Sequence, residues 1–209
     1  MNKDQIHQLQ ERLSQSLPGW RAQSTLSPVR GERYRNPASD ALHAGVNILL
    51  HPNEKDALEI FFIKRPSNNP LDKHGGQISF PGGKREEGDK DLVDTALRET
   101  MEEIGVPVSE MTVLGQLSPL YVFVSNFLVQ PIVSYIDYRP ELKIQESEVN
   151  YVINESVQIL QDDSAIGRTD YKVRDFIIKD MPHYKLQNDI LWGATAMITA
   201  EFLQLVREL

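Results

Sequence analysis

Residues 82–106 read GGKREEGDKDLVDTALRETMEEIGV, and the second half of this stretch has the period of a helix. Within residues 90–104 the apolar residues recur at intervals of four, four and three, at Val93, Leu97, Met101 and Ile104. That spacing gives a helix one apolar stripe, and the following Gly105 is the residue type that commonly ends a helix. The stretch therefore predicts an amphipathic helix that ends at a glycine.

Three carboxylates lie together on the other edge of this predicted helix. At about 100° per residue, Glu99 and Glu103 are about 40° apart, and Glu102 is about 60° to the other side of Glu99. Like charges at this spacing destabilise a helix by about 0.2–0.5 kcal/mol per pair. A divalent cation reverses that cost, because Mg²⁺ prefers carboxylate oxygens. We therefore expect Glu99, Glu102 and Glu103 to bind Mg²⁺ or Mn²⁺, with Arg98 beside them to hold a carboxylate in place.

A glycine-rich turn, Pro81-Gly82-Gly83, precedes the helix and is separated from it by an acidic loop. Glycines let the backbone approach a ligand, and exposed amides bind phosphate oxygens. Taken singly, an acidic helix face is usually a solvated surface, and such a turn is usually only a turn. The order of turn, acidic loop and carboxylate helix is far more specific and predicts a site for a phosphorylated ligand.

Residues 82–106 resemble the Nudix box, whose usual pattern is GX5EX7REUXEEXGU with U apolar. The matching residues are Arg98, Glu99, Glu102, Glu103, Gly105 and Val106. Thr100 stands at an apolar position, Asp89 stands where glutamate is usual, and eight residues separate Asp89 from Arg98. The resemblance implies an enzyme that hydrolyses a nucleotide diphosphate bridge. It also implies catalytic roles for Arg98, Glu102 and Glu103, and leaves open which carboxylate, on the helix or on a nearby loop, is the base.

The upstream stretch KR…HGGQISFPGGK, residues 64–84, resembles the coenzyme A pyrophosphatase branch of this superfamily, whose signature is roughly LLTXRSX3RX3GGX3FPGG. The residues that fit are Arg65, Gly75, Gly76, Phe80, Pro81, Gly82 and Gly83. Pro66 replaces the serine, and the second arginine has no counterpart, Asp72 being nearest. The resemblance implies cleavage of coenzyme A to 3′,5′-ADP and 4′-phosphopantetheine, with Arg65, Gly76, Gly82 and Gly83 binding the substrate.

Two other functions are compatible with the same residues. The first is a Nudix hydrolase of another nucleoside diphosphate derivative, such as ADP-ribose, NADH or a dinucleoside polyphosphate, since the box does not fix the ligand. The second is a catalytically inactive Nudix module that senses a nucleotide, but such a module predicts a damaged carboxylate helix, and the run RETMEE is intact. His74, before the glycines, is more often a solvated or structural histidine than a catalytic one.

The order of elements along the chain predicts an α/β fold, an α+β sandwich in which a Nudix-type mixed β-sheet packs between helices. Residues 1–40 are expected to form an N-terminal helix over 3–17 and an extended arm over 18–40, and residues 41–209 the hydrolase domain. The expected strands are 43–51, 58–65, 77–80, 111–117, 127–135, 148–153 and 171–178. A short helical turn at VQILQ and a final helix carrying Ile198, Phe202, Leu205 and Leu209 complete the prediction.

Composition narrows the partners. The 209 residues carry a formal net charge of −8, which disfavours sequence-independent binding to nucleic acid, and the absence of cysteine excludes disulfides and thiolate metal sites. The local basic group Arg30, Arg33 and Arg35 is either a solvated linker or a set of phosphate-binding arginines. No signal-peptide core or membrane-spanning run is evident. We therefore expect a cytoplasmic enzyme for a small-molecule nucleotide, without nucleic-acid or membrane partners; a homodimer is compatible with the sequence.

Overall fold

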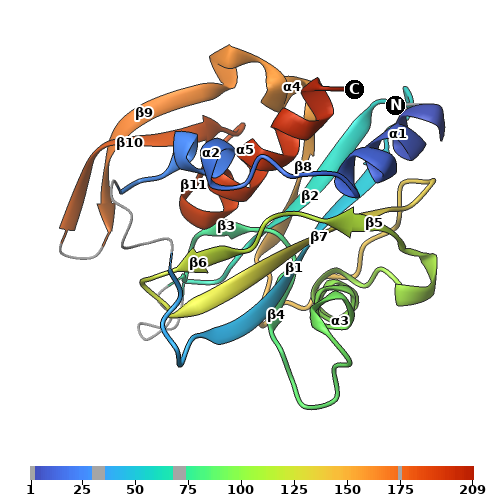
Figure 1. Cartoon of the computed structure of the whole chain (residues 1–209), viewed down its shortest axis with the longest axis horizontal. Coiled ribbons are helices and arrows are strands. Elements are labelled where there is room, and N and C mark those ends of the chain that lie inside the picture. Colours follow the sequence, from blue (N-terminus) through green and yellow to red (C-terminus); the bar gives the residue numbers. More distant parts are fainter. Residues whose placement is uncertain (1–2, 30–35, 68–73, 174–175) are drawn as a thin grey trace.

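An eight-stranded mixed sheet forms the centre of the computed structural model, which describes residues 3–29, 36–67, 74–173 and 176–209 (Figure 1). The long strand β1 (Leu42–Pro52) pairs in parallel with β7 (Phe127–Tyr135) and antiparallel with β2 (Leu58–Lys64). Beyond β7 lies β5 (Thr112–Gln116), and β8 (Tyr151–Ser156) pairs with β2. One parallel pair among antiparallel ones confirms the predicted mixed sheet.

Two short strands link β2 to β1 at the end where the site forms. Strand β3 (Ile78–Ser79) pairs with the last residues of β2, and β4 (Gly82–Lys84) pairs with β1 at Ala44–Val46. The glycine turn predicted from the sequence is therefore partly a strand. This pairing fixes the backbone of the glycines against the central strand.

Helices cover both faces of the sheet. Because side chains alternate along a strand, Phe61 and Ile63 of β2 face one way, into an apolar cluster with α3 (Leu92–Ile104). Ile60 and Phe62 face the other way, into the larger cluster that includes residues of α5 (Gly193–Arg207). Figure 1 shows α3 and α5 on opposite sides of β1 and β7. The structure thus confirms the predicted sandwich.

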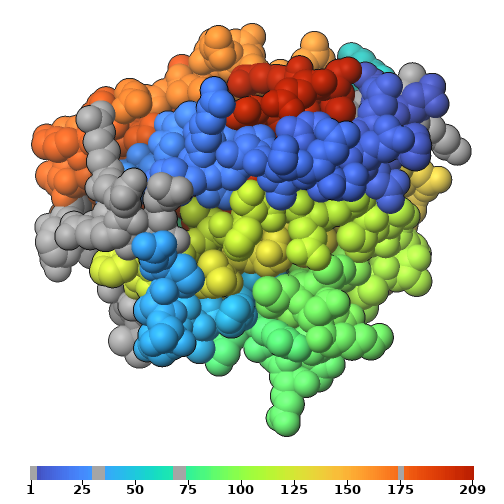
Figure 2. Space-filling model, in the orientation of Figure 1, coloured from blue at the N-terminus to red at the C-terminus, as the bar shows by residue number. Residues whose placement is uncertain are grey.

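The N-terminal region contains more helix than the sequence predicted. Helix α1 (Lys3–Leu13) is followed by α2 (Trp20–Gln23) and a 3-10 turn, η1 (Ser24–Leu26), where an extended arm was expected. These turns are too short to show a period. They are held by Glu201 of α5, a fully buried carboxylate that accepts hydrogen bonds from Gly19 N at 3.0 Å and Gln23 Nε2 at 2.8 Å. Figure 2 shows residues 3–29 as a blue band alongside the red C-terminal helix α5.

The later half of the chain also differs from the predicted strands. A second, three-stranded sheet comprises β9 (Ile166–Val173), β10 (Phe176–Lys185) and β11 (Ile190–Trp192), where one strand at 171–178 was predicted. Strand β6 (Leu120–Val122), which pairs with β7, was missed. The remaining short elements are η3 (Val108–Glu110), η4 (Asp163–Ala165) and α4 (Val157–Gln161), the last of which matches the predicted VQILQ turn. None of the described helices has both the length and the apolar character needed to cross a membrane.

Candidate active site

Helix α3 lies within the predicted range 90–104 and ends at the predicted Gly105. Asp91 is its N-cap, and its side chain accepts hydrogen bonds from Val93 N and Asp94 N, both at 2.9 Å. The helix ends at Gly105, whose φ of 78° is left-handed and whose N donates to Met101 O. Met101 itself is 43% exposed, so the buried stripe is narrower than predicted.

Thr100, which departs from the usual apolar residue of the box, is fully buried but has hydrogen-bond partners. Its Oγ1 donates to Ala96 O at 2.7 Å and accepts from Asn47 Nδ2 at 3.0 Å. Asn47 Oδ1 in turn accepts from Ser134 Oγ at 2.7 Å. A polar chain therefore fastens α3 to β1 and β7, and this explains how a threonine is accommodated at a core position.

The glycine strand β4 lies against the carboxylates of α3. Glu103 Oε2 accepts a hydrogen bond from Gly82 N at 2.8 Å. At Gly82, where φ is 150°, an added Cβ would lie 2.4 Å from Gly45 O. At Gly83 an added Cβ would lie 2.4 Å from Glu99 Oε1. Position 82 needs glycine because a side chain there would collide with the backbone of β1, whereas a side chain at position 83 would displace the Glu99 carboxylate.

Three carboxylates converge beside this strand. Among the described residues, Glu99, Glu103 and Glu148 each offer an oxygen, and these oxygens lie within 4.8 Å of one another. An all-oxygen donor set of this kind suits a hard divalent cation such as Mg²⁺ or Mn²⁺. Glu148 was not predicted as a ligand and fell inside the strand predicted at 148–153, whereas β8 begins only at Tyr151. The only signal for it was the family's use of either a helix glutamate or a nearby loop carboxylate as base.

Burial sets the proton affinity of this group. Desolvation, with smaller contributions from the neighbouring Glu99 and Glu148, raises the pKa of Glu103 from 4.5 to about 8, although the Gly82 N–H and Arg65 lower it. Burial also raises the pKa of Glu99. Without a cation, Glu103 is therefore largely protonated at neutral pH, and a bound cation would favour its ionised form.

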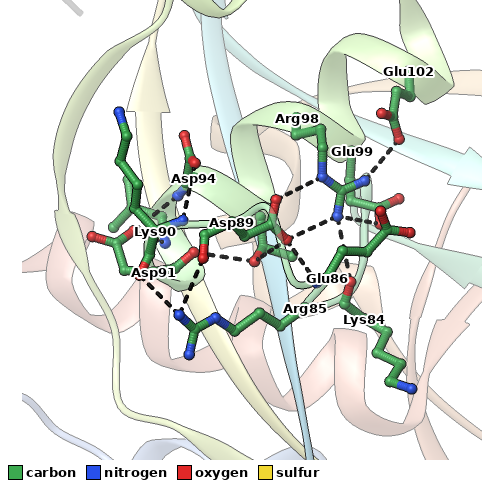
Figure 3. A network of polar contacts seen from close by, with 12 residues as sticks. Lys84, Arg85, Glu86, Asp89, Lys90, Asp91, Asp94, Arg98, Glu99 and Glu102 are labelled. Atoms are coloured by element: carbon green, nitrogen blue, oxygen red, sulfur yellow. Dashed lines mark hydrogen bonds and ion pairs between the residues drawn. The ribbon is translucent and has the colours of Figure 1, made fainter.

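Arg98 is held by Asp89 and reaches the helix carboxylates (Figure 3). Its Nε and Nη2 donate to the two oxygens of Asp89 at 2.8 and 3.0 Å. Its Nη1 donates to Glu102 at 2.8 Å, and its Nη2 lies 3.1 Å from Glu99 Oε1. The hydrogen bond from Arg98 is the main reason that the pKa of Asp89 is far below its ordinary value. Asp89 thus orients Arg98, although eight residues separate the two instead of the seven that are usual in the Nudix box.

The structure separates Glu102 from the other predicted ligands. Its side chain is 49% exposed and pairs with Arg98. It is absent from the three-carboxylate group formed by the described residues, in which Glu148 joins Glu99 and Glu103. Sequence periodicity placed Glu102 on the correct helix edge but could not show that Arg98 binds its carboxylate.

Arg65 follows β2 and lies beside the carboxylates. Its Nη1 is 3.9 Å from Glu103 Oε1, and its side chain is 31% exposed. Gly76, whose N lies 3.2 Å from Arg65 O, is at the base of the connection between β2 and β3 rather than at the carboxylates. His74 Nδ1 is 3.1 Å from Gln77 Oε1. Lys64, the preceding cation, binds Asp189 at 2.5 Å.

Some predicted cations fall outside the described residues. Arg30, Arg33 and Arg35, and Lys73, which the sequence also offers as a donor for the 3′-phosphate of coenzyme A, belong to the ranges 30–35 and 68–73, outside the described residues. Their suggested contact with phosphate therefore stays a prediction. The described part of the site consists of strand β4, helix α3, the start of the β2–β3 connection and the segment that carries Glu148.

Comparison with known proteins identifies the family. The NUDIX domain model matches residues 41–159. The uncharacterized Nudix hydrolase NudL of Pectobacterium atrosepticum is 33% identical over 157 residues, which cover 73% of this chain and 76% of that protein. The NudL protein of Yersinia pestis is 31% identical over 178 residues, which cover 77% and 86% of the two chains.

Solved structures support the same fold. The Nudix hydrolase RenU from M. smegmatis matches with a TM-score of 0.52 at 14% identity, over 80% of this chain and 84% of that one. A MutT/nudix family protein from Enterococcus faecalis matches with a TM-score of 0.51 at 19% identity, over 99% of this chain and 75% of that one. The domain model, which matches more than half of the sequence, and the identity to the NudL proteins establish that the chain belongs to the Nudix hydrolase family, enzymes that hydrolyse pyrophosphate bonds in nucleoside diphosphate derivatives.

Proposed function

We propose that this chain is a Mg²⁺- or Mn²⁺-dependent enzyme that cleaves the diphosphate of coenzyme A or its derivatives to 3′,5′-ADP and 4′-phosphopantetheine. The observation that supports diphosphate hydrolysis most directly is the convergence of Glu99, Glu103 and Glu148 beside the glycine strand. The choice of coenzyme A rests on the run KR…HGGQISFPGGK.

The carboxylates have the chemistry that such a reaction requires. A divalent cation, when bound by Glu99, Glu103 and Glu148, supplies charge neutralisation for the diphosphate and lowers the pKa of a coordinated water. Glu103 must be ionised to act as a ligand, and the Gly82 N–H and Arg65 both favour its ionised form. Asp89 orients Arg98, whose Nη2 lies next to Glu99 and keeps that carboxylate in place.

The general base is proposed from the same set of carboxylates. Glu102 and Glu103 are the bases suggested by the resemblance to the box, and Glu148 joins them on the basis of its position. Glu102 would have to leave Arg98 before it could accept a proton or bind a cation. Glu148 is exposed and approaches the group from outside the helix, so it is accessible to a water, whereas Glu103 is buried.

Recognition of the substrate is assigned to Arg65 and to the backbone of Gly83, while Gly82, whose N–H is bound to Glu103 Oε2, contributes by letting the strand lie close to the site. Arg65 lies at the edge of the carboxylate group, where a guanidinium can bind a phosphate oxygen. The 3′-phosphate of coenzyme A needs a further cation. Because Lys64 is bound to Asp189, the proposed donors for that phosphate are Arg30, Arg33, Arg35 and Lys73.

Product analysis on a matched set of substrates tests the proposal. Coenzyme A, an acyl-coenzyme A, dephospho-coenzyme A, ADP-ribose, NADH and diadenosine polyphosphates are supplied at equal concentration with Mg²⁺ or Mn²⁺. We expect coenzyme A to be cleaved fastest and dephospho-coenzyme A more slowly, with added salt narrowing the gap by screening. Faster cleavage of ADP-ribose would favour a different Nudix substrate, and no turnover of any compound would favour a nucleotide sensor. A Glu103→Gln preparation controls for contaminating phosphatases.

A further inference from the structure

The segment that carries Glu148 caps the C-terminal end of α3. Lys143 N donates to Ile104 O at 3.0 Å, and Gln145 N donates to Glu103 O at 2.9 Å. The last carbonyls of a helix have no partner within the helix itself. Residues 143–149, here called the Glu148 loop, therefore satisfy two backbone acceptors of α3, one of them belonging to the residue whose side chain faces the carboxylate group.

The Glu148 loop is also fixed internally. Glu148 N and Val149 N both donate to Gln145 O, at 2.9 and 2.8 Å. Val149 is 1% exposed and belongs to the apolar cluster that includes Leu97 and Ile104 of α3. Glu148 is thus held between a backbone anchor at Gln145 and a side-chain anchor at Val149. Both anchors rest on α3, so the position of Glu148 follows that of the helix end.

Gly105 makes this contact sterically possible. A Cβ built there would lie 2.8 Å from Lys143 Cβ and 3.0 Å from both N and O of Lys143. Two of these are backbone atoms, which cannot rotate away as the end of a flexible side chain can. Any residue other than glycine at position 105 would therefore displace the Glu148 loop, in addition to the strain of a left-handed φ.

We propose that Gly105 is a positioning residue for the carboxylate group. By admitting Lys143 to the end of α3, it brings Glu148 within 4.8 Å of Glu99 and Glu103. The inference rests on the proposed metal-binding role of these three carboxylates. It adds that the end of the helix and the third carboxylate form one unit, so that a change at Gly105 acts on the site through Glu148.

A matched pair of glycine substitutions separates displacement of the loop from backbone strain. Gly193 also has a left-handed φ, of 65°, but a Cβ built there meets nothing within 4 Å. Gly105→Ala and Gly193→Ala therefore share the strain, and only the first collides with the loop. We expect Gly105→Ala to weaken Mn²⁺ binding, measured by electron paramagnetic resonance, about tenfold or more, and Gly193→Ala to leave it within about twofold.

A double-mutant cycle shows whether Gly105 acts through Glu148. The double variant Gly105→Ala/Glu148→Gln should bind Mn²⁺ as weakly as Glu148→Gln alone, because the displaced carboxylate is already lost. Additive losses would overturn the proposal. Val149→Ala, which loosens the other anchor without a left-handed φ, gives the same cycle if Gly105→Ala reduces the yield of folded protein, and the same non-additivity is expected.

Amide hydrogen exchange in chelator-treated protein tests the loop independently of any metal. The amides of Lys143 and Gln145 should exchange faster in Gly105→Ala than in the wild type, and at the wild-type rate in Gly193→Ala. Unchanged protection in Gly105→Ala would overturn the positioning role. Failure of the wild type to bind Mn²⁺ or Mg²⁺ would instead contradict the proposed function, and the exchange result would still decide whether Gly105 positions the loop.

Discussion

Asp89 and Arg98 are joined by two hydrogen bonds, in which Nε and Nη2 of Arg98 donate to the two carboxylate oxygens of Asp89 at 2.8 and 3.0 Å. The Asp89 side chain is only 4% exposed and also accepts from Thr95 Oγ1 at 2.8 Å. The pair therefore ties the acidic loop to α3 and turns the guanidinium toward Glu99 and Glu102. Because the buried Asp89 carboxylate accepts several hydrogen bonds, we expect it to contribute to the stability of the fold.

Asp89→Ala should destabilise the fold by about 2 kcal/mol, because it leaves part of a buried hydrogen-bond network without its acceptor. Urea unfolding at neutral pH measures the loss. Asp170→Ala is the matched control, since it removes an exposed pair with Lys179 and should change stability little. Equal effects of the two substitutions would contradict the structural role of Asp89.

The same pair predicts a direction of pH dependence. Because the folded-state pKa of Asp89 is lowered, its contribution is present above the ordinary aspartate range and is lost as the pH falls through that range and below it. The gap in unfolding free energy between the wild type and Asp89→Ala should therefore narrow in acid. A gap that stays constant down to the acid limit of folding would show that the charge of Asp89 is not what stabilises the pair.

The raised pKa of Glu103 predicts a pH dependence of stability opposite to that of Asp89. Its pKa is raised from 4.5 to about 8, so the folded chain binds a proton that the unfolded chain releases in this interval. In the presence of a chelator, the free energy of unfolding should fall as the pH rises from 5 to 8, by an amount on the order of a few kcal/mol. Urea unfolding at several pH values measures the slope.

Glu103→Gln is the control for this slope. The amide oxygen can still accept the hydrogen bond from Gly82 N, but it has no proton to lose. The metal-free variant should be less sensitive to pH than the wild type and the more stable of the two at pH 8. Parallel curves for the two proteins would mean that Glu103 is ionised in the metal-free fold.

Catalysis should depend on the same carboxylate. Glu103→Gln should lower kcat by about 10² or more, because it removes a ligand used in the transition state, with no loss of stability at neutral pH. Removal of divalent cations by a chelator should abolish turnover of the wild type, and added Mg²⁺ or Mn²⁺ should restore it. Near-normal turnover of Glu103→Gln would refute the assignment of the metal site to α3.

The sequence predicted α3 and its glycines well because their signals are local. The apolar period and the end at Gly105 lie within one stretch, and each acts on its immediate neighbours; the cap at Asp91, which the structure adds, is equally local. Glu99 and Glu103 could be placed on one edge from helix geometry alone. The structure adds that Glu103 is buried against Gly82, a contact between residues that are 21 positions apart.

What the sequence could not predict depends on tertiary contacts. Glu148 reaches the site because the backbone amides of residues 143 and 145 donate hydrogen bonds to the end of α3. A backbone hydrogen bond of this kind does not depend on the side chain, so the sequence carries no sign of it. The orientation of Glu102 is set by its hydrogen bond with Arg98. Because Arg98 lies near more than one carboxylate, the sequence alone could not show which of them it binds. The helical turns at 20–26 are similarly fixed by the buried Glu201, far away in the sequence.

Arg65 allows two roles to be told apart. Its Nη1 lies 3.9 Å from Glu103 Oε1, which is compatible with simple support of that carboxylate, yet 31% of its side chain is exposed beside the proposed phosphate site. If Arg65 binds phosphate, Arg65→Ala should raise KM for the diphosphate substrate about tenfold or more, through loss of a charge-assisted hydrogen bond. Arg65→Lys should recover part of the loss, since it keeps the charge but not the fork of donors. If Arg65 only supports Glu103, the loss should appear in Mn²⁺ affinity while KM at saturating metal is unchanged.

Arg168→Ala, at an exposed pair with Asp180 in the second sheet, controls for the general loss of a positive charge. Steady-state kinetics and Mn²⁺ titration on the same preparations decide between the roles, and wild-type values of kcat, KM and metal affinity in Arg65→Ala would exclude both.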